Sequence, residues 1–334
     1  MNYWNKTLNF KIKYFNKRKD LAVRRPILII TLFLLYSIAH AQIFTARIEK
    51  LPLPTNQEWA YPVFSPDGKK IYFTNSSYNG IWEYNLSTNK LRQITNAPGS
   101  GYGFTISDDG NQLVYRKTTY DEKTFERIQE FYQVNLKTLS QKKIVSGSDI
   151  SNPTFVKSNV IYTSGFETKN LEKVRLSKET KVIGIENTKI VILHNGERKV
   201  LDPFGNGSYI WPSLSPDKTK LVAYEADRGA FVCDLNGNIL AKLGRVDAPI
   251  WTRDGKYIIY MDDKDDGHFI LSSEIMAITP DGKEKYQLTS TPNVIEMYPH
   301  TSPIENKIVC SSLSGEIFII HYNYGERKSN ESEN

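Results

Sequence analysis

Four aromatic residues stand at matching places in similar short segments spread along the chain, and they are the strongest candidates for a binding site. Tyr61 begins the segment YPVF, Tyr102 begins YGFT, Trp211 begins WPSL and Tyr298 begins YPHT. Aromatic rings with polar tips suit the binding of sugars or peptide segments. The same rings can instead serve packing between repeated units. The sequence leaves both interpretations open.

His300 is the fifth candidate, because it follows Tyr298 by two residues in the same segment. No second histidine or cysteine occupies the equivalent place in the other segments, so the sequence predicts neither a metal site nor a cofactor there. The alternative is a histidine that is simply packed or solvated. The chain also lacks a Gly-x-Ser-x-Gly segment, the turn that carries the nucleophile of many hydrolases, and no catalytic residue is assigned.

Two other segments have residue types that could bind ions. Asp262–Gly267, DDKDDG, offers the oxygen ligands that Ca²⁺ prefers, but Lys264 stands where a calcium loop needs an acid. A solvated hairpin tip is therefore expected. Gly99–Gly103, GSGYG, could suggest a phosphate cradle, yet no helix follows it. We expect a flexible loop between two repeats instead.

The elements that carry these residues are copies of one strand–turn–strand unit. The stretch Tyr61–Phe73, YPVFSPDGKKIYF, returns in recognisable form further along the chain. The copies begin at Tyr61, Tyr102, Asn152, Trp211, Ala248 and Tyr298. In the turn Ser65–Gly68, proline sets φ near about −65°, aspartate bonds the backbone that follows and glycine accepts a positive φ. The apolar runs on either side have the length of strands.

The repeats predict an all-β fold, a six-bladed β-propeller of four-stranded antiparallel blades, because further strand-like runs follow the unit in most repeats. The weak point is the interval of 59 residues between Pro153 and Pro212. Lys181–Leu201 holds three strand-like runs there, so either the third blade is elaborated or a degenerate seventh blade is present; six blades are favoured. The last repeat has only three strands, and Ile43–Ile48 is predicted to close the ring beside Glu316–Tyr322.

The first 41 residues have the pattern of a signal peptide. A basic stretch over residues 1–26 precedes an uncharged apolar run over Ile27–Ala39, and Ala39-His40-Ala41 predicts cleavage after Ala41. The alternative is an uncleaved membrane anchor. We therefore expect three segments: the signal peptide over 1–41, the propeller over 42–322 and a polar tail over 323–334. The mature protein is expected to be periplasmic or secreted, without a stable membrane span.

Removal of the leader changes the charge balance of the chain. The leader holds eight of the 43 basic residues and one of the 37 acidic residues, which leaves 35 and 36 in the mature protein. A nearly neutral domain gives no electrostatic reason to expect a nucleic-acid partner. Cys233 and Cys310 each lie in an apolar run, where a buried free thiol is expected rather than a disulfide. The expected state is a monomer.

The pattern of Pro62–Phe73, together with the closing runs QIT at Gln93–Thr95 and QLT at Gln287–Thr289, resembles the WD-like repeat of the TolB-type β-propeller family. The resemblance covers about residues 43–322. It implies the propeller fold, whereas function differs among relatives. TolB itself binds envelope partners and carries an extra α/β domain, for which residues 42–60 leave no room. Relatives of prolyl oligopeptidase add a serine hydrolase, and propeller pectin lyases gather metal-binding histidines, which are scattered here.

These observations predict an exported, non-catalytic β-propeller that acts as a binding module in the cell envelope. The expected ligand is an envelope protein, or a carbohydrate or peptide, at the mouth of the central channel. The expected ligand-binding residues are Tyr61, Tyr102, Trp211, Tyr298 and His300. The alternative is a carbohydrate-active lyase or hydrolase that uses the same channel mouth.

Overall fold

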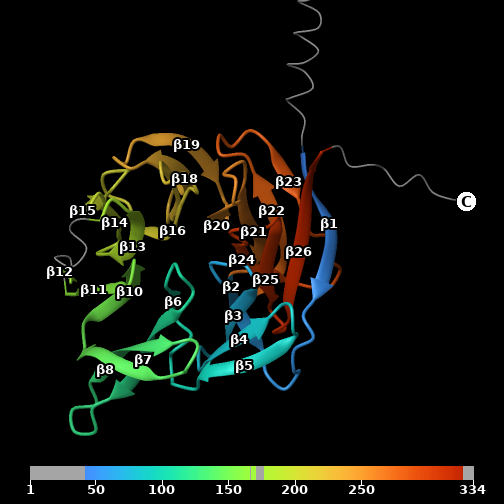
Figure 1. Ribbon diagram of the computed structural model, residues 1–334. Helices are drawn as coiled ribbons and strands as arrows, with labels where there is room; N and C mark the ends of the chain where they lie inside the picture. The colour runs from blue at the N-terminus through green and yellow to red at the C-terminus, as the bar shows by residue number, and fades with distance from the viewer. Residues whose placement is uncertain (1–41, 166, 171–176, 326–334) are drawn as a thin grey trace, which may run out of the picture. The chain divides into compact units, whose positions relative to one another are not determined.

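Short strands joined by tight turns make up the regular structure of this protein. The computed structural model describes residues 42–165, 167–170 and 177–325, so the predicted signal peptide and residues 326–334 of the predicted tail lie outside the described residues. Within that part of the chain the strands form seven separate sheets. Figure 1 shows the sheets arranged as blades around a common centre. We number the blades 1 to 7 in chain order.

The first four blades follow one another along the chain. Blade 1 consists of β2 (Trp59–Phe64), β3 (Lys70–Asn75), β4 (Ile81–Asn85) and β5 (Lys90–Thr95). Blade 2 consists of β6 (Thr105–Ile106), β7 (Gln112–Tyr120), β8 (Arg127–Asn135) and β9 (Gln141–Gly147). Blade 3 contains β10 (Ile150–Val156), β11 (Asn159–Ser164) and β12 (Glu167–Lys169). Blade 4 contains β13 (Thr180–Glu186), β14 (Lys189–His194) and β15 (Glu197–Leu201).

The last three blades are four-stranded, and the seventh takes its outer strand from the other end of the chain. Blade 5 consists of β16 (Tyr209–Leu214), β17 (Lys220–Glu225), β18 (Gly229–Asp234) and β19 (Ile239–Gly244). Blade 6 consists of β20 (Asp247–Trp251), β21 (Ile258–Asp265), β22 (Ile270–Ile278) and β23 (Lys285–Gln287). Blade 7 consists of β24 (Glu296–Thr301), β25 (Lys307–Ser312), β26 (Ile317–Gly325) and β1 (Gln42–Lys50).

The prediction of an all-β propeller with four-stranded antiparallel blades is confirmed, with three strands described in blades 3 and 4, but the prediction of six blades is wrong. The additional blade is blade 4, built from the three runs noted within Lys181–Leu201. Its apolar strand pattern is intact, whereas its first hairpin turns through Asn187 and Thr188 between the paired residues Glu186 and Lys189. Blade 4 has neither the proline of the innermost strand nor a turn of the Ser-Pro-Asp-Gly type, whereas each other blade keeps at least one of these two signatures. A count of those signatures therefore passes over this blade.

The serine of each signature turn, together with the aspartate, fixes the hairpin between the first two strands of a blade. In blade 1 the Ser65 hydroxyl donates to Asp67 Oδ1 at 2.6 Å and accepts from the Lys70 backbone N–H at 3.0 Å. Asp67 Oδ1 also accepts from the Lys69 N–H at 3.1 Å, and Gly68 has a φ of 65°. These are the roles that the sequence predicts for Asp67 and Gly68. Blades 2, 5 and 6 repeat the Ser or Thr to Asp bond.

The core consists of seven apolar clusters, each between neighbouring blades. Between blades 2 and 3, for example, Phe131 packs with Ile150 and Phe155, which are all less than 5% exposed. Burial of apolar surface contributes about 25 cal/mol per Å². Because each blade buries both faces against its neighbours, an incomplete ring would leave two apolar faces in water. The predicted free thiols Cys233 and Cys310 lie in two of these clusters, buried and unpaired.

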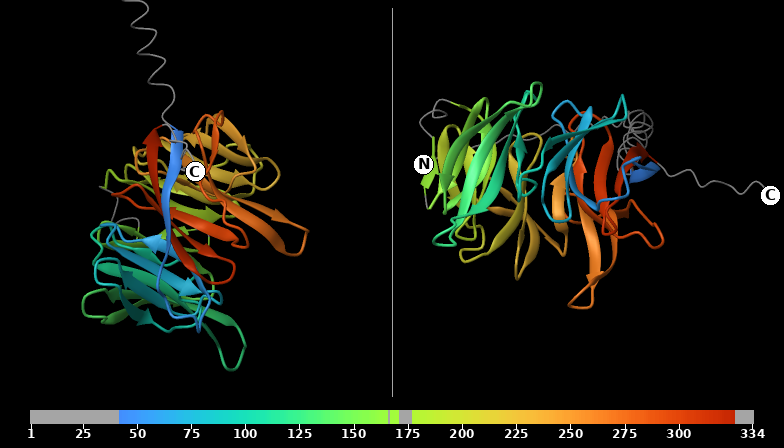
Figure 2. Two further views of the ribbon diagram at one scale, coloured as in Figure 1. Left: turned by 90° about the vertical axis from the view of Figure 1, so that its right-hand side faces the viewer. Right: turned by 90° about the horizontal axis from the view of Figure 1, so that it is seen from below.

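The N-terminal strand closes the ring, as predicted. β1 pairs with β26 in the sheet of blade 7, and Figure 2 shows the two strands side by side. Ile43 is 2% exposed in the cluster between blades 6 and 7, and the Thr45 hydroxyl donates to the Leu288 carbonyl of blade 6 at 2.6 Å. The compact unit of the propeller is Ile43–Tyr324. β26 thus runs beyond residue 322, where the sequence predicted the tail to begin.

Candidate functional site

A cavity of about 520 Å³ lies at one end of the central channel. It is lined by the innermost strands of blades 1, 5, 6 and 7 and by the segment that leads into β6 of blade 2. All five residues predicted from the sequence line it: Tyr61, Tyr102, Trp211, Tyr298 and His300. We call this cavity the mouth.

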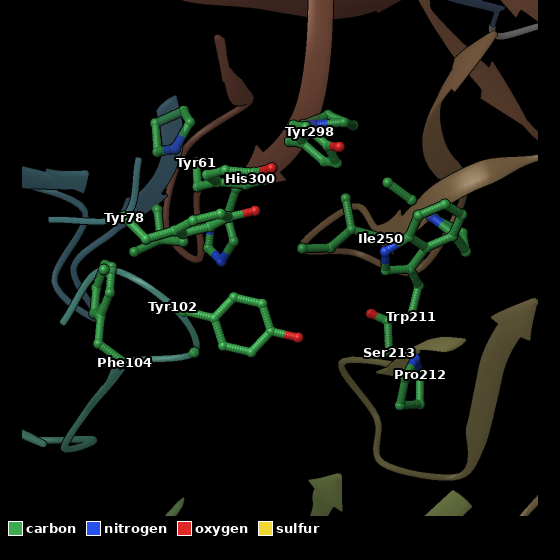
Figure 3. Close-up of a pocket in the computed structure, with 17 residues that line it drawn as sticks. Tyr61, Tyr78, Tyr102, Phe104, Trp211, Pro212, Ser213, Ile250, Tyr298 and His300 are labelled. Atoms are coloured by element: carbon green, nitrogen blue, oxygen red, sulfur yellow. The ribbon is translucent and has the colours of Figure 1, made fainter. Parts of the chain in front are cut away.

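Three tyrosine rings form a continuous surface on one side of the mouth. The rings of Tyr61 and Tyr78 stack with centroids 4.8 Å apart and planes at 20°. Tyr298 adjoins Tyr61 at 4.4 Å and 40°, and Tyr102 meets the edge of Tyr78 at 5.3 Å. In Figure 3 the hydroxyl groups of these tyrosines point toward the side of the cavity occupied by Trp211 and Ile250. This side of the mouth is thus an aromatic surface with phenolic hydroxyl groups along its edge.

Tyr78 is a member of this surface that the repeat pattern misses. It comes from the loop between β3 and β4 and has a φ of 58°. The corresponding loops of blades 2 and 6 also contain an aromatic residue, Phe125 and Phe269, but both are exposed and neither lines the mouth. The sequence offers one local signal, the turn-forming run Tyr78-Asn79-Gly80 after a strand. That signal predicts a turn and gives no direction for the side chain.

A β-bulge in each of five innermost strands aims the mouth residues. In blade 1, Ala60 pairs with Thr74 and Val63 with Tyr72, so Tyr61 and Pro62 together oppose one residue. Tyr61 has a φ of 52°, in the left-handed region that residues with a Cβ rarely adopt. The same conformation recurs before proline at Asn152, Trp211, Ala248 and Tyr298, with φ from 48° to 54°. Proline fits at a bulge because it has no N–H to give to the ladder.

Tyr102 reaches the mouth by a different route from the one the sequence suggests. Tyr61 lies four residues before the turn serine Ser65, and the residue four before Ser107 is Gly103, not Tyr102. Gly103 has the positive φ, 67°, that belongs to this position. The expectation that Tyr102 occupies the same repeat position as Tyr61 is therefore wrong by one residue. Its side chain still lines the mouth and is 55% exposed.

His300 lies deeper than the mouth position expected for it. It also lines a second cavity of about 500 Å³ that continues the channel toward the signature turns, and the two cavities share Val63, Phe104, Ser213 and Ile250. Its Nδ1 accepts a hydrogen bond from the Phe64 backbone N–H at 3.3 Å. Burial lowers the pKa of His300 to about 4, so the ring is neutral at physiological pH. It therefore presents Nε2–H as a donor between the two cavities.

The phenols of Tyr61 and Tyr78 also remain uncharged at physiological pH. Burial, followed by the neighbouring hydroxyls of Tyr78 and Tyr298, raises the pKa of Tyr61 well above its ordinary value. Burial likewise raises the pKa of Tyr78. The residues that line the mouth include no Lys, Arg, Asp or Glu, and His300 is their one imidazole. The lining therefore offers apolar rings and neutral hydrogen-bonding groups to whatever enters.

The acidic segment Asp262–Gly267 lies at the end of the β21–β22 hairpin with Lys264–Gly267 exposed, as predicted, but two of its aspartates are also held in ion pairs. β21 continues to Asp265, and only the following residues form the turn to β22. Arg245 binds Asp263 at 3.1 Å, Asp265 at 3.3 Å and Asp247 at 3.2 Å. The strand pairing carries these acids into a salt-bridge cluster, which a reading of local turn residues cannot foresee. Burial and the neighbouring Asp263 raise the pKa of Asp247 to about 6, although Arg245 opposes the shift.

The glycine-rich segment Gly99–Gly103 is a connection between blades, as predicted. It joins β5 to β6, and a Cβ on Gly101 would collide with the Thr74 side chain. In the described residues no group of three or more His, Cys, Asp or Glu side chains is arranged to hold a metal ion. Across the same residues, no helix has both the length and the apolar character needed to cross a membrane.

Comparisons with known proteins concern the fold. No protein-family model matches the chain, and no curated protein matches it. The chain is similar to the crystal structure of TolB from Acinetobacter baumannii at 20% identity and a TM-score of 0.49, over 73% of this chain and 57% of that one. It is similar to oligogalacturonate lyase from Vibrio parahaemolyticus at 14% identity and 0.47, over 85% and 98%.

A third similar structure is a chain of the Mitotic Checkpoint Complex, at 9% identity and a TM-score of 0.57, over 95% of this chain and 98% of that one. At such low identities a likeness concerns the fold alone. The activities named for those proteins are not transferred to this chain by the likeness. The function must be argued from the mouth itself.

Proposed function

We propose that this protein is a non-catalytic binding module of the cell envelope and that the mouth of its channel holds an uncharged part of its ligand. The observation that carries the proposal is the tyrosine surface of Tyr61, Tyr78 and Tyr298, which faces Trp211 across a cavity of about 520 Å³. Small-ligand sites are concave, mostly apolar and supplied with a few polar groups. The mouth has this composition.

The bulges bring three aromatic rings to the mouth, where they are available for binding. A residue with a Cβ in the left-handed region costs about 1–2 kcal/mol, yet Tyr61, Trp211 and Tyr298 all adopt it. Trp211 and Tyr298 also pack against the apolar cluster between blades 6 and 7, so these two rings contribute to packing and line the mouth at the same time. The strained backbone turns these rings toward the channel, where a sugar or peptide segment can stack on them.

Export to the envelope is part of the proposal and rests on the sequence of residues 1–41. The basic stretch, the apolar run and Ala39-His40-Ala41 support a cleaved leader. We expect the mature protein to begin at Gln42. N-terminal sequencing of the protein from fractionated cells checks this, and a chain that retains Met1 in the membrane fraction would contradict it.

The binding role is tested with the double variant Tyr61→Ala/Trp211→Ala. Purified protein, residues 42–334, is immobilised and presented with cellohexaose, maltohexaose, chitohexaose and a detergent-free envelope extract. We expect the wild type to retain a glycan or protein that the double variant releases, at a melting temperature within a few degrees of wild type. Tyr120→Ala is the matched control, because this exposed tyrosine lies outside the mouth.

Two results would count against the binding role. If the double variant unfolds while the control remains folded, the rings serve packing between blades. If both variants retain the same bound species as the wild type, the mouth is not the binding site. Quenching of Trp211 fluorescence, identified by its loss in Trp211→Phe, gives an independent measure of occupancy.

A second candidate function is a carbohydrate-active lyase or hydrolase, and one observation favours it. Asp247 directly precedes Ala248, which lines the mouth, and its pKa is raised to about 6 beside the Asp263 carboxyl. A carboxyl with a pKa close to neutral pH can exchange its proton there and so can act as a general acid or base. The test is release of reducing ends from the three oligosaccharides by wild type and by Asp247→Asn. Absence of turnover in the wild type, or equal turnover in the variant, removes this candidate.

A further inference from the structure

Arg116 lies beside the mouth and has an unusual environment for a cation. It belongs to β7, the strand next to the segment that carries Tyr102 into the mouth. Its guanidinium carbon is 4.5 Å from the centroid of the Tyr102 ring. The side chain is partly buried, and its Nε is enclosed without a hydrogen-bond partner in the described chain. Partial burial removes water from the guanidinium, and no hydrogen bond to Nε compensates for that loss.

Other partly buried arginines of the blades are neutralised by carboxylates. Arg92 binds Glu83 at 2.9 Å, and Arg198 binds Glu186 at 2.5 Å. Within the described residues Arg116 forms no ion pair with a carboxylate within 4.0 Å, and the charge of Arg127 repels it. Burial and then this repulsion lower the pKa of Arg116, whereas Tyr102 opposes the shift. Arg116 therefore holds a positive charge that no carboxylate among the described residues compensates.

A buried acceptor without a partner lies on the same face of the same hairpin. In the pairing of β7 with β8, Arg116 is opposite Phe131, Thr118 is opposite Gln129 and Tyr120 is opposite Arg127. Alternate residues share a face, so Gln129 and Arg127 lie on the side of Arg116. Gln129 is 5% exposed, and its Oε1 has no hydrogen-bond partner in the described chain. This face looks toward blade 3, where Phe131 packs.

We propose that Arg116 and Gln129 form a subsite for a carboxylate group carried by the ligand of the mouth. The inference rests on the proposed binding function and specifies its ligand: an uncharged portion lies against the tyrosine surface and a carboxylate extends past Tyr102 to the blade 2 hairpin. Arginine pairs with carboxylates through parallel N–H···O bonds. Gln129 Oε1 accepts a hydrogen bond from a neighbouring hydroxyl or amide of the ligand. The carboxylate supplies the counterion that the described residues do not, and Arg127 adds attraction from the more exposed part of the hairpin.

Two matched pairs of small probes test the subsite and separate the sources of the carboxylate. One pair is sodium glucuronate and glucose, and the other is N-acetylalanine and its amide, all at constant ionic strength. Binding to the 42–334 protein is measured by calorimetry and by the rise in melting temperature. We expect glucuronate or N-acetylalanine to bind more tightly than its neutral partner, and Arg116→Gln to weaken that probe about tenfold or more, as loss of a charged hydrogen-bonded contact does. Arg116→Lys is expected to restore part of the affinity.

Lys123→Gln is the control for net charge, because Lys123 is an exposed cation in the turn of the same hairpin. It should leave the affinity unchanged. The subsite is overturned if neither acid binds more tightly than its neutral partner, or if Arg116→Gln and Lys123→Gln weaken binding equally. Trp211→Ala separates this inference from the proposed function. Carboxylate binding that persists in Trp211→Ala but is lost in Arg116→Gln supports the subsite even if the mouth binds no glycan. If the wild type captures a glycan but each acid binds no more tightly than its neutral partner, only the binding role of the mouth is supported.

Discussion

At the scale of single residues, buried polar groups without partners mark the places where this propeller does more than pack. Arg116, Gln129 and Glu296 each bury a side-chain atom that has no hydrogen-bond partner in the described chain. Such atoms cost about 1–3 kcal/mol each. For Arg116 and Gln129 the cost is best explained by a ligand. For Glu296, on the innermost strand of blade 7, burial instead raises the pKa of the carboxyl.

Glu296 should make the stability of the protein depend on pH. Burial, with the nearby Glu274 carboxylate, raises its pKa from 4.5 to about 7. The folded state thus favours the protonated form, and the stabilisation is complete below about pH 4.5 and lost as the pH rises through about 7. At about 1.4 kcal/mol per pKa unit, Glu296→Gln should gain roughly 3 kcal/mol over wild type between pH 4.5 and 8.

The measurement for Glu296→Gln is urea unfolding of both proteins at the two pH values. The difference in unfolding free energy between variant and wild type is compared across pH, so that other titrating groups cancel. Glu305→Gln serves as a control, because Glu305 is an exposed carboxylate of the same blade. A difference that stays constant from pH 4.5 to 8 would show that Glu296 ionises normally.

At the scale of elements, the bulge before each proline is the device that shapes the innermost strands. Ala248 gives the cleanest view of it, because it has a φ of 48° and a side chain of one methyl group. Glycine accepts this conformation freely, whereas a β-branched residue there is a marked outlier. The order of stability should therefore be Ala248→Gly equal to or above wild type, and Ala248→Val below wild type by about 2 kcal/mol.

Thermal unfolding of the Ala248 variants checks the left-handed conformation directly. Ala223→Gly is the matched control, since Ala223 lies inside β17 at 0% exposure and has no positive φ. We expect the control to lose stability by about 1 kcal/mol or more from entropy and the lost methyl. If Ala248→Gly loses as much as Ala223→Gly, the bulge does not hold Ala248 in the left-handed region.

At the scale of the whole molecule, the ring depends on β1, which brings the start of the propeller to its last blade. Deletion of residues 42–50 should lower the melting temperature strongly, because it uncovers the edge of β26 and the apolar cluster between blades 6 and 7. A point variant isolates the packing part. Ile43→Asp buries a charge at a site 2% exposed, and Ile48→Asp changes a residue that is 38% exposed. Circular dichroism melting should show a large loss for the first and little for the second; equal losses would mean that β1 contributes no core.

Local features of the fold are readable from the sequence because they depend on residues close together in the chain. The turn at Ser65–Gly68, the strand lengths and the closing role of Ile43–Ile48 all follow from turn chemistry and apolar pattern. Tyr61, Trp211 and Tyr298 meet in one cavity because they hold equivalent places in the repeat, whereas Tyr102 and His300 reach it from neighbouring positions. Blade 4 was not counted as a separate blade because it lacks the signature proline and turn, although its apolar pattern is complete.

The sequence by itself determined that this protein is a propeller of repeated hairpins with aromatic residues at the starts of its innermost strands, because those features are written in local spacing. Only the tertiary structure decided that there are seven blades, that Tyr78 joins the tyrosine surface, that His300 lies between two cavities and that Arg116 has no counterion among the described residues. The physical reason is that ring closure, ring stacking and charge compensation are sums over residues from distant strands. A local sequence pattern does not say which residues from distant strands come into contact.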